Sequence, residues 1–231
     1  MTDTAKPPAR DPFDLPDVST LTVGVLGGTG EQGRGLAYRW AQAGQRVIIG
    51  SRDEQRAQAV AADLGATVEG ATNVVCAARA DVVVAAVPWA GHEALLTELR
   101  TALAGKIIVD CVNPLGFDKQ GAFALAVAQG SAAQQAAELL PDSTVVAAFH
   151  HISAVLLLDD SVPTLDTDVL VLGDQRDATD TVQALANRIP GLRGIYGGRL
   201  RNAAQVEAFT ANLISINRRY KAHGGVRITD V

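Results

Sequence analysis

The sequence has little of what secreted, metal-binding or membrane proteins carry. Its 231 residues include only two cysteines, Cys76 and Cys111, on separate predicted elements, so buried thiols are expected rather than a disulfide. No zinc-site spacing of cysteine and histidine occurs, and no metal ligands are predicted. No apolar run approaches the roughly 20 residues of a membrane span. The polar, proline-rich residues 1–20 lack the order of a signal peptide. A cytoplasmic protein without a membrane partner is expected.

Aromatic residues and net positive charge are also scarce. Aromatics make up 4% of the chain and its formal net charge is -5, whereas nucleic-acid-binding proteins usually carry a broad basic face and aromatic platforms. Positive charge gathers only towards the carboxyl terminus, where two acidic residues are outnumbered by eight basic ones, Arg188, Arg193, Arg199, Arg201, Arg218, Arg219, Lys221 and Arg227. This predicts a local surface for a small polyanionic ligand and no nucleic-acid partner. A solvated helix surface is the alternative.

Glycine, in contrast, follows a clear pattern near the amino terminus. Leu21–Leu26 is too short for a helix and has the composition of a buried parallel strand. Gly28, Gly30 and Gly33 follow in the spacing G-x-G-x-x-G, ahead of a helical pattern with one apolar face, Leu36, Ala37, Trp40 and Ala41. Glycines let backbone N–H groups approach a pyrophosphate at a helix N-terminus. Because a second strand at Arg46–Ile49 completes a βαβ unit, a dinucleotide site is predicted; a tight turn without a ligand is the alternative.

The residues after this second strand indicate which dinucleotide binds. Ser51 and Arg52 stand where an NAD site usually has an acidic residue, and Arg56 lies one helical turn later. A guanidinium is permanently charged and forks onto phosphate oxygens, and the i, i+4 spacing lets both arginines converge on one anion. NADP is therefore predicted over NAD. The alternative is that Asp53 holds a ribose, although Asp53 is better placed to cap the next helix.

Strands and helices alternate through the middle of the chain. Strands are predicted to end at Glu69, Val87, Asp110 and Phe149, with helices over Asp53–Leu64, Thr72–Arg79, Gly91–Leu103 and Ser131–Leu140. The loop at 116–130 is expected to contain a helical piece, Ala122–Val127. Ligands lie across the carboxyl ends of parallel strands, so four residues should face the glycine turn and hold a nicotinamide, Val87, Pro88, Trp89 and Asn113. Ordinary packing is the commoner role for Trp89, and His92 is expected to face solvent.

Two adjacent histidines follow the last of these strands. His150 and His151 stand at the edge where site residues collect, and one of them is expected to be structural and the other functional. Beyond them, a strand at Asp168–Leu172 leads to a helix at Ala178–Ile189, capped by Asp174 or Asp177, and then to a short strand, Leu192–Tyr196. The long amphipathic helix Leu200–Tyr220 is expected to fold back on the sheet or join a second subunit, with the tail His223–Val231 closing the crevice.

Several segments occur together in an order that resembles one family. They are GGTGEQGRGLA, GSR with Arg56, VPW at Val87–Trp89, VNP at Val112–Pro114, AFHHISA at Ala148–Ala154 and LRNAAQVE at Leu200–Glu207. The chain resembles the F420H2:NADP+ oxidoreductases, which are NADP-dependent reductases of the deazaflavin coenzyme F420. The resemblance covers everything from Leu21 to the tail.

The resemblance implies a fold, two coenzymes and a set of site residues. The fold is α/β, a doubly wound, mostly parallel Rossmann sheet with a small C-terminal helical or α+β part, in a homodimer. The composition of residues 1–20 predicts a disordered arm, which departs from the family pattern, whereas 21–150 would be the NADP-binding domain and 151–231 the part that completes the deazaflavin site and the dimer contacts. By position, the NADP(H) contacts would be Thr29, Gly30, Glu31 and Gln32 at the pyrophosphate, Ser51, Arg52 and Arg56 at the 2′-phosphate, and Val87, Asn113 and Ala154 at the nicotinamide. The deazaflavin would lie against His150, Ile152 and Ser153, whereas Glu31 departs from expectation by placing a carboxylate near phosphates.

The residues agree with hydride transfer in one respect. The chain has no nucleophile elbow, no carboxylate pair and no lysine placed as a base, and hydride transfer between two flat rings asks mainly for juxtaposition. Because histidine titrates near neutrality, His150 or His151 is a candidate proton relay for the deazaflavin ring. Two alternatives remain. One is another NADP-dependent reductase on the same scaffold, such as an imine or ferric reductase, and the other is a regulatory protein that senses NADP(H) without chemistry.

Overall fold

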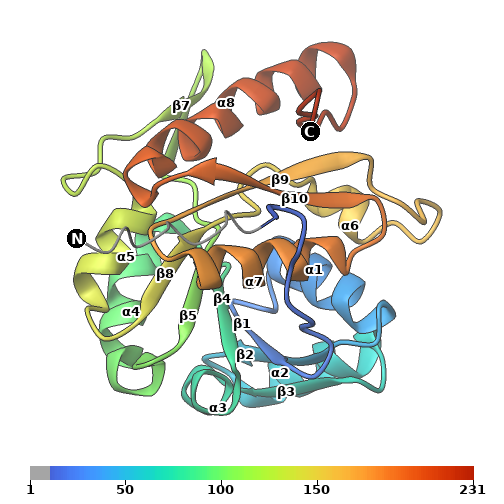
Figure 1. Ribbon diagram of the computed structural model, residues 1–231, viewed down its shortest axis with the longest axis vertical. Helices are drawn as coiled ribbons and strands as arrows, with labels where there is room; N and C mark the ends of the chain where they lie inside the picture. Colours follow the sequence, from blue (N-terminus) through green and yellow to red (C-terminus); the bar gives the residue numbers. More distant parts are fainter. Residues whose placement is uncertain (1–10) are drawn as a thin grey trace, which may run out of the picture.

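One eight-stranded sheet runs through the molecule (Figure 1). The computed structural model describes residues 11–231, so the first half of the expected arm lies outside the described residues; of the second half, Val18 is buried. The strand order is β10-β9-β8-β5-β4-β1-β2-β3. The strands are β1 (Thr22–Leu26), β2 (Arg46–Ser51), β3 (Val68–Thr72), β4 (Val82–Ala85), β5 (Ile107–Asp110), β8 (Thr144–Ala147), β9 (Thr167–Gly173) and β10 (Leu192–Gly198). The pairs from β8 to β3 are parallel, β9 is antiparallel to β8, and β10 is parallel to β9.

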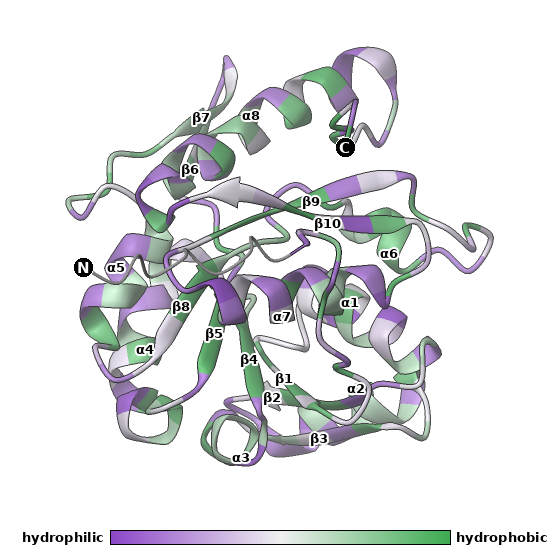
Figure 2. Ribbon diagram, viewed as in Figure 1, coloured by the Kyte–Doolittle hydropathy of each residue, from purple (hydrophilic) through white to green (hydrophobic). Residues whose placement is uncertain are grey.

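Helices cover both faces of this sheet, and each face has its own apolar core. One core gathers side chains of α1 (Glu31–Gln42), α2 (Glu54–Leu64), α6 (Ala154–Leu157) and α7 (Arg176–Asn187). The other gathers side chains of α3 (Asn73–Arg79), α4 (Trp89–Leu103), α5 (Ala132–Leu139), η1 (Leu200–Asn202) and α8 (Ala203–Tyr220). Figure 2 shows the central strands coloured as apolar between these layers. The predicted doubly wound, mostly parallel sheet with a C-terminal helical part is confirmed, and β9 and β10 of residues 151–231 extend the same sheet.

The loop after β5 differs from its prediction. The helical piece expected at Ala122–Val127 is wrong, because this segment forms an antiparallel hairpin of β6 (Leu115–Asp118) and β7 (Gly121–Ala124). The turn explains the difference. The Asp118 carboxylate accepts the backbone N–H groups of Gln120 and Gly121, at 2.7 and 3.2 Å, and Gly121 has φ of 123°. A side-chain acceptor and a glycine at positive φ favour a hairpin turn over a helix, and the hairpin packs against α8 (Figure 1).

Two helix starts also differ from the sequence expectation. The helix predicted from Gly91 begins at Trp89, because the Gly91 N–H already bonds the Pro88 carbonyl at 2.9 Å. Helix α7 has Gln175 as its N-cap without a side-chain capping bond, so the predicted caps Asp174 and Asp177 are wrong. Asp174 instead pairs with Arg199 across 3.8 Å.

The remaining chain-level expectations concern the thiols and the membrane. Cys76 and Cys111 are both free and buried, which confirms the prediction of buried thiols. No helix in residues 11–231 has the length and apolar character needed to cross a bilayer.

Candidate functional site

The turn between β1 and α1 lies directly against two neighbouring strands. Gly27 has φ of 73°, and a Cβ there would stand 2.5 Å from the Ala86 carbonyl oxygen beyond β4. A Cβ on Gly28 would stand 2.6 Å from Cβ of Ile49 in β2, and one on Gly33 would stand 2.7 Å from the Gly27 carbonyl oxygen. These contacts admit glycine alone, so the backbone of the turn is held close to both strands and to the first turn of α1.

The amino end of α1 is open to an anion. Gly30 is its N-cap and supplies no side-chain hydrogen bond, so N–H groups of the first turn are left for a ligand. Thr29 is partly exposed, and Glu31 is exposed beside these groups. Gln32 is directed elsewhere, because its Nε2 donates to the Phe149 carbonyl at 3.3 Å. The turn and the end of β8 are thereby joined.

The end of β2 carries two arginines without partners. Asp53 accepts the Arg56 backbone N–H at 3.1 Å and caps α2, which confirms the capping expectation. The Asp53 N–H in turn donates to Ser51 Oγ at 3.1 Å. The side chains of Arg52 and Arg56 are exposed and make no ion pair or hydrogen bond with any residue from 11 to 231. Two guanidinium groups therefore stand free where a second anion would lie.

The strands β4, β5 and β8 end side by side next to the glycine turn. A Cβ on Gly27 would stand 2.8 Å from Val87 Cγ1, so Val87 adjoins the turn, with Pro88 exposed and Trp89 partly exposed after it. Asn113 donates from Nδ2 to the His150 carbonyl at 2.8 Å. Thr210 of α8 donates to the same carbonyl at 3.2 Å, within 3.4 Å of Asn113 Oδ1. Sequence reasoning missed Thr210, although it lies one turn after Val206 on the inward face of α8.

A strained residue introduces the histidine pair. Phe149 is buried and has φ of 65°, a conformation that costs free energy for any residue other than glycine. Its ring packs edge-on against Trp40, with centroids 5.5 Å apart. This conformation ends β8 at Ala147, two residues earlier than predicted, and turns the backbone towards His150.

Both histidines are buried, and three of their four ring nitrogens lack a hydrogen-bond partner among residues 11–231. His150 is 4% exposed, and neither of its ring nitrogens has a hydrogen-bond partner among residues 11–231. Burial lowers the pKa of His150 to about 4, against an opposing effect of Asp110, so the expectation that it titrates near neutrality is wrong. His151 is 5% exposed; it donates from Nε2 to the Asp168 carbonyl at 2.7 Å and leaves Nδ1 without a partner. Burial lowers the pKa of His151 as well. Both imidazoles are thus neutral near pH 7 and offer acceptor nitrogens.

The residues after the histidines connect the site to the tail. Ile152 is buried in the apolar core, and Ala154 begins α6. Ser153 caps α6 by accepting the Leu156 N–H at 3.4 Å, and its Oγ lies 3.5 Å from Nδ1 of His223. The tail therefore reaches the edge where the histidines lie.

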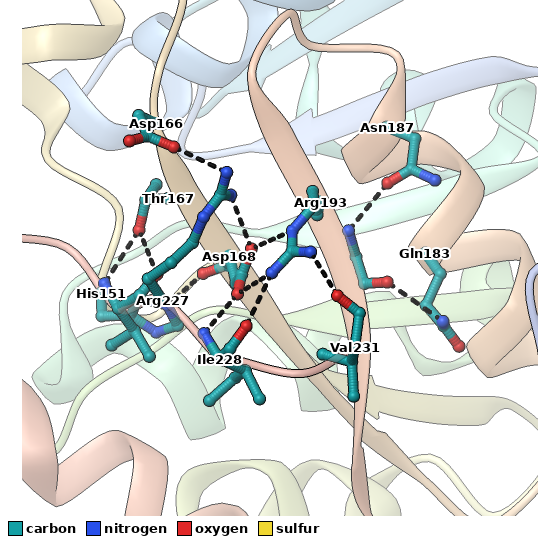
Figure 3. A network of polar contacts seen from close by, with 12 residues as sticks. His151, Asp166, Thr167, Asp168, Gln183, Asn187, Arg193, Arg227, Ile228 and Val231 are labelled. Carbon is teal, nitrogen blue, oxygen red and sulfur yellow. Dashed lines mark hydrogen bonds and ion pairs between the residues drawn. The ribbon is translucent and has the colours of Figure 1, made fainter.

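Asp168, which sequence reasoning did not single out, fastens this tail (Figure 3). Its carboxylate is fully buried and accepts two bonds from Arg193, at 2.7 and 2.8 Å, one from Arg227 at 3.0 Å and one from the Ile228 N–H at 2.6 Å. Burial alone would raise the pKa of Asp168, but these bonds outweigh it and hold the pKa at about 2. A lone carboxylate at the start of an apolar strand was the available signal.

His92 is the clearest correction among the predicted positions. It was expected to face solvent, yet it is fully buried, with Nε2 2.6 Å from Oδ2 of Asp110 and Nδ1 3.0 Å from Oε1 of Gln135. The sequence held the signal, because His92 shares the helical spacing of the buried residues Leu96, Leu99 and Leu103.

Other features limit the site. Arg193 and Arg227 are paired with Asp168, so the cationic surface expected at 188–231 is reduced chiefly to Arg201, Arg218, Arg219 and Lys221. A cavity of about 770 Å³ between residues 12–15, α7 and β10 contains none of the predicted site residues. No group of three or more His, Cys, Asp or Glu side chains in residues 11–231 is placed to hold a metal ion.

Several of the relatives of this chain carry the same description. Residues 22–114 match the family described as "NADP oxidoreductase coenzyme F420-dependent". The chain is 40% identical over 226 residues to the F420-dependent NADP reductase of Methanothermobacter thermautotrophicus, and the aligned residues cover 93% of this chain and 97% of that protein. It is 35% identical over 224 residues to that of Methanocaldococcus jannaschii, covering 91% and 99%. A crystal structure described as a putative F420-dependent NADP reductase from Arthrobacter sp. FB24 has a TM-score of 0.78 and 28% identity, covering 90% and 99%.

The Asp168 contacts predict a pH-dependent stability. The folded pKa of about 2 lies below the ordinary 3.8, so this stabilisation is complete above the ordinary value and is lost as pH falls from 3.8 towards 2. Asp168→Asn should lower the free energy of unfolding at pH 7 by roughly 2 kcal/mol or more, and the deficit should shrink in acid. Urea unfolding across this pH range measures it. The control is Asp174→Asn, whose ion pair is exposed and weak; an equal loss in both variants would contradict the assignment.

Proposed function

Because this chain belongs to the F420-dependent NADP reductase family, we propose that it transfers hydride reversibly between NADP(H) and coenzyme F420, a deazaflavin. The observation that carries the proposal in this chain is the pairing of two features at adjacent strand ends. The amino end of α1, which has no side-chain cap, follows β1 at the glycine turn, and Arg52 and Arg56, which have no partner among residues 11–231, follow β2. NADP(H) carries a pyrophosphate and an additional ribose phosphate, one anion for each of these two features, which favours NADP(H) over NAD(H).

We assign the NADP(H) contacts to residues of the turn and of the β2 end. The backbone at Gly28, Gly30 and Gly33 approaches the pyrophosphate, because these three residues have no Cβ. Ser51, Arg52 and Arg56 hold the 2′-phosphate, since both guanidinium groups are free to fork onto its oxygens. The exposed Glu31 carboxylate affects side-chain contacts with the phosphates only, because the glycine turn and the first turn of α1 bind them through backbone N–H groups.

The two reacting rings are assigned to the ends of β4, β5 and β8. The nicotinamide lies towards Val87, Pro88, Trp89, Asn113 and Ala154, and the deazaflavin towards His150, Ile152 and Ser153. When both coenzymes are bound, they would supply the chemistry: a hydride would pass between nicotinamide C4 and deazaflavin C5, and the deazaflavin pyrimidine ring would take up or release a proton. The chain contributes juxtaposition, which is worth roughly 7–11 kcal/mol of a barrier when two reactants are held in contact.

The proton at the pyrimidine ring is assigned to the histidine pair. His151 has the better geometry for a relay, because the Asp168 carbonyl fixes its proton on Nε2 and leaves Nδ1 as an acceptor. His150 is neutral and has no protein partner on either nitrogen. Neutral imidazoles in this place accept a proton when the deazaflavin is oxidised and return it in the opposite direction.

We also propose a cytoplasmic homodimer. Large apolar side chains are exposed on α8 and on the hairpin packed against it, namely Phe117, Phe123, Leu125, Phe209, Ile216 and Tyr220. Exposed apolar patches of this kind mark association surfaces, and a symmetric dimer uses the same patch twice. Sedimentation of wild-type protein as a single subunit at micromolar concentration would exclude the dimer.

The proposed function predicts a measurable activity. Purified protein should reduce coenzyme F420 with NADPH, followed as loss of the deazaflavin absorption band, and should run in reverse with NADP+ and reduced F420. NADH in place of NADPH and a flavin in place of F420 are the controls. NADPH oxidation by other acceptors without any F420 reduction would favour a different reductase, and NADPH binding with no oxidation by any acceptor would favour a regulator.

Arg52 should select for the extra phosphate. Arg52→Gln should raise KM for NADPH roughly 10–100-fold, because a charge-assisted hydrogen bond contributes roughly 1.5–3 kcal/mol, and should leave KM for NADH unchanged. Arg56→Gln should act in the same direction. Arg100→Gln removes an exposed charge at the far end of α4 and is the matched control. Equal effects on NADPH and NADH would contradict the 2′-phosphate assignment.

The relay predicts a change in the pH dependence of turnover. His151→Asn should lower kcat with F420 roughly 100-fold or more, the usual contribution of a general acid or base, and should remove an ionisation from the pH–rate profile. His150→Asn tests the other member of the pair. If neither substitution alters the profile, the proton reaches the pyrimidine ring without these residues.

A further inference from the structure

A group of buried polar side chains lies beneath the ends of β4 and β5, outside the contacts assigned above. Its centre is His92 of α4, with Nε2 2.6 Å from Oδ2 of Asp110 in β5. Both side chains have no exposed surface. An ion pair removed from water in this way is costly unless each remaining polar atom is satisfied, so the geometry of its other contacts is informative.

The two partners of His92 define its charge. Asp110 accepts at Nε2, and Oε1 of Gln135 accepts at Nδ1 across 3.0 Å. Gln135 presents its oxygen because its Nε2 faces the side-chain oxygen of Gln129, at 3.5 Å. An imidazolium, which donates from both ring nitrogens, satisfies both acceptors, and we assign this form to His92. Burial alone would lower its pKa, but Asp110, Gln135 and Glu207 outweigh burial and raise it.

A second carboxylate interacts with His92. Glu207 of α8 is buried and accepts the N–H groups of Ala132 and Ala133, at 2.9 and 3.1 Å, at the start of α5. The pKa of Glu207 is raised to about 7, because burial and the charge of Asp110 outweigh the opposing effects of the Ala132 and Ala133 N–H groups and of His92. The groups facing His92 are therefore Asp110 from β5, Gln135 from α5, Glu207 from α8 and the indole of Trp89 from its own helix.

His92 contacts the segments that follow β4 and β5 in two ways. Its ring lies against Trp89, with centroids 5.5 Å apart and planes 33° apart, a contact that a charged imidazole strengthens. Through Asp110 it also fixes the next segment, because the second carboxylate oxygen accepts the Val112 N–H at 3.0 Å. The residue after Val112 is Asn113, which bonds the His150 carbonyl. One side chain thus joins the segments that follow β4, β5 and β8.

We propose that His92, held as an imidazolium between Asp110 and Gln135, is a positioning residue that sets Trp89 and Asn113 against the nicotinamide ring of NADP(H). It touches neither coenzyme and acts through these two neighbours. The proposal rests on the proposed function, because it gives Trp89 and Asn113 their places beside that ring.

Three variants test the proposal. His92→Phe keeps the bulk and removes both polar contacts, and His92→Gln keeps one donor towards Asp110 without the charge. Glu93→Gln, exposed on the next position of α4, is the matched control. The measurements are kcat and KM with NADPH and F420, binding of adenosine 2′,5′-bisphosphate, and emission of Trp89 in a Trp40→Phe background, in which Trp89 is the only tryptophan.

Loss of positioning should separate the two halves of the coenzyme. His92→Phe should lower kcat roughly 10–100-fold, the cost of a displacement of about 1 Å at a reacting ring, and His92→Gln should recover part of this. Adenosine 2′,5′-bisphosphate, which lacks the nicotinamide, should bind all three variants as it binds the wild type. The change in Trp89 emission on adding NADPH should disappear in His92→Phe and persist in Glu93→Gln.

Two results would overturn the proposal. One is a kcat for both His92 variants equal to that of Glu93→Gln, and the other is an unchanged Trp89 response to NADPH. If His92→Phe fails to fold and no longer binds the bisphosphate, His92→Gln gives the result. If wild-type protein does not reduce F420, the proposed function fails, whereas the Trp89 response still decides the role of His92.

Discussion

Close approach between the β1–α1 turn and the ends of β2 and β4 is the constraint on which the rest of the site depends. Backbone atoms at Gly27, Gly28 and Gly33 occupy positions where any Cβ would overlap a neighbour by a large fraction of an ångström. The result is a fixed distance between the amino end of α1 and the ends of two neighbouring strands, β2 and β4. Because β1 lies between β2 and β4, a ligand that begins at the helix end can extend to the arginines in one direction and to Val87 in the other.

Much of the architecture follows from local patterns. The βαβ unit, the parallel order and the cap of α2 follow from short apolar runs, glycines and Asp53, each of which acts within a few residues. The resemblance drawn from six short motifs is confirmed by relatives that match along nearly the whole chain. The proposed role of Arg52 and Arg56 rests on their i, i+4 spacing in the sequence and on exposed side chains that make no ion pair or hydrogen bond with any residue from 11 to 231.

What the sequence did not disclose depends on contacts between distant segments. The hairpin at residues 115–124 required recognising Asp118 as a turn former, and the burial of His92 required giving its helical spacing more weight than its polarity. The lowered pKa of His150 comes from the strands around it, and no neighbour in sequence signals it. Phe149 is a further case, because nothing local indicates that a phenylalanine adopts a left-handed conformation; its packing against Trp40, more than a hundred residues earlier, accompanies it.

The order of the chain gives the Asp168 contacts a consequence for the assembly of the fold. The carboxylate belongs to β9, whereas its partners Arg227 and Ile228 come 59 and 60 residues later, beyond α8. When every strand has joined the sheet, Arg193 of β10 supplies two of the four hydrogen bonds to this carboxylate, and the other two wait for the segment after α8. Asp168 must therefore keep part of its hydration until that segment packs, so the edge of the crevice next to His151 is the part of the fold that forms late.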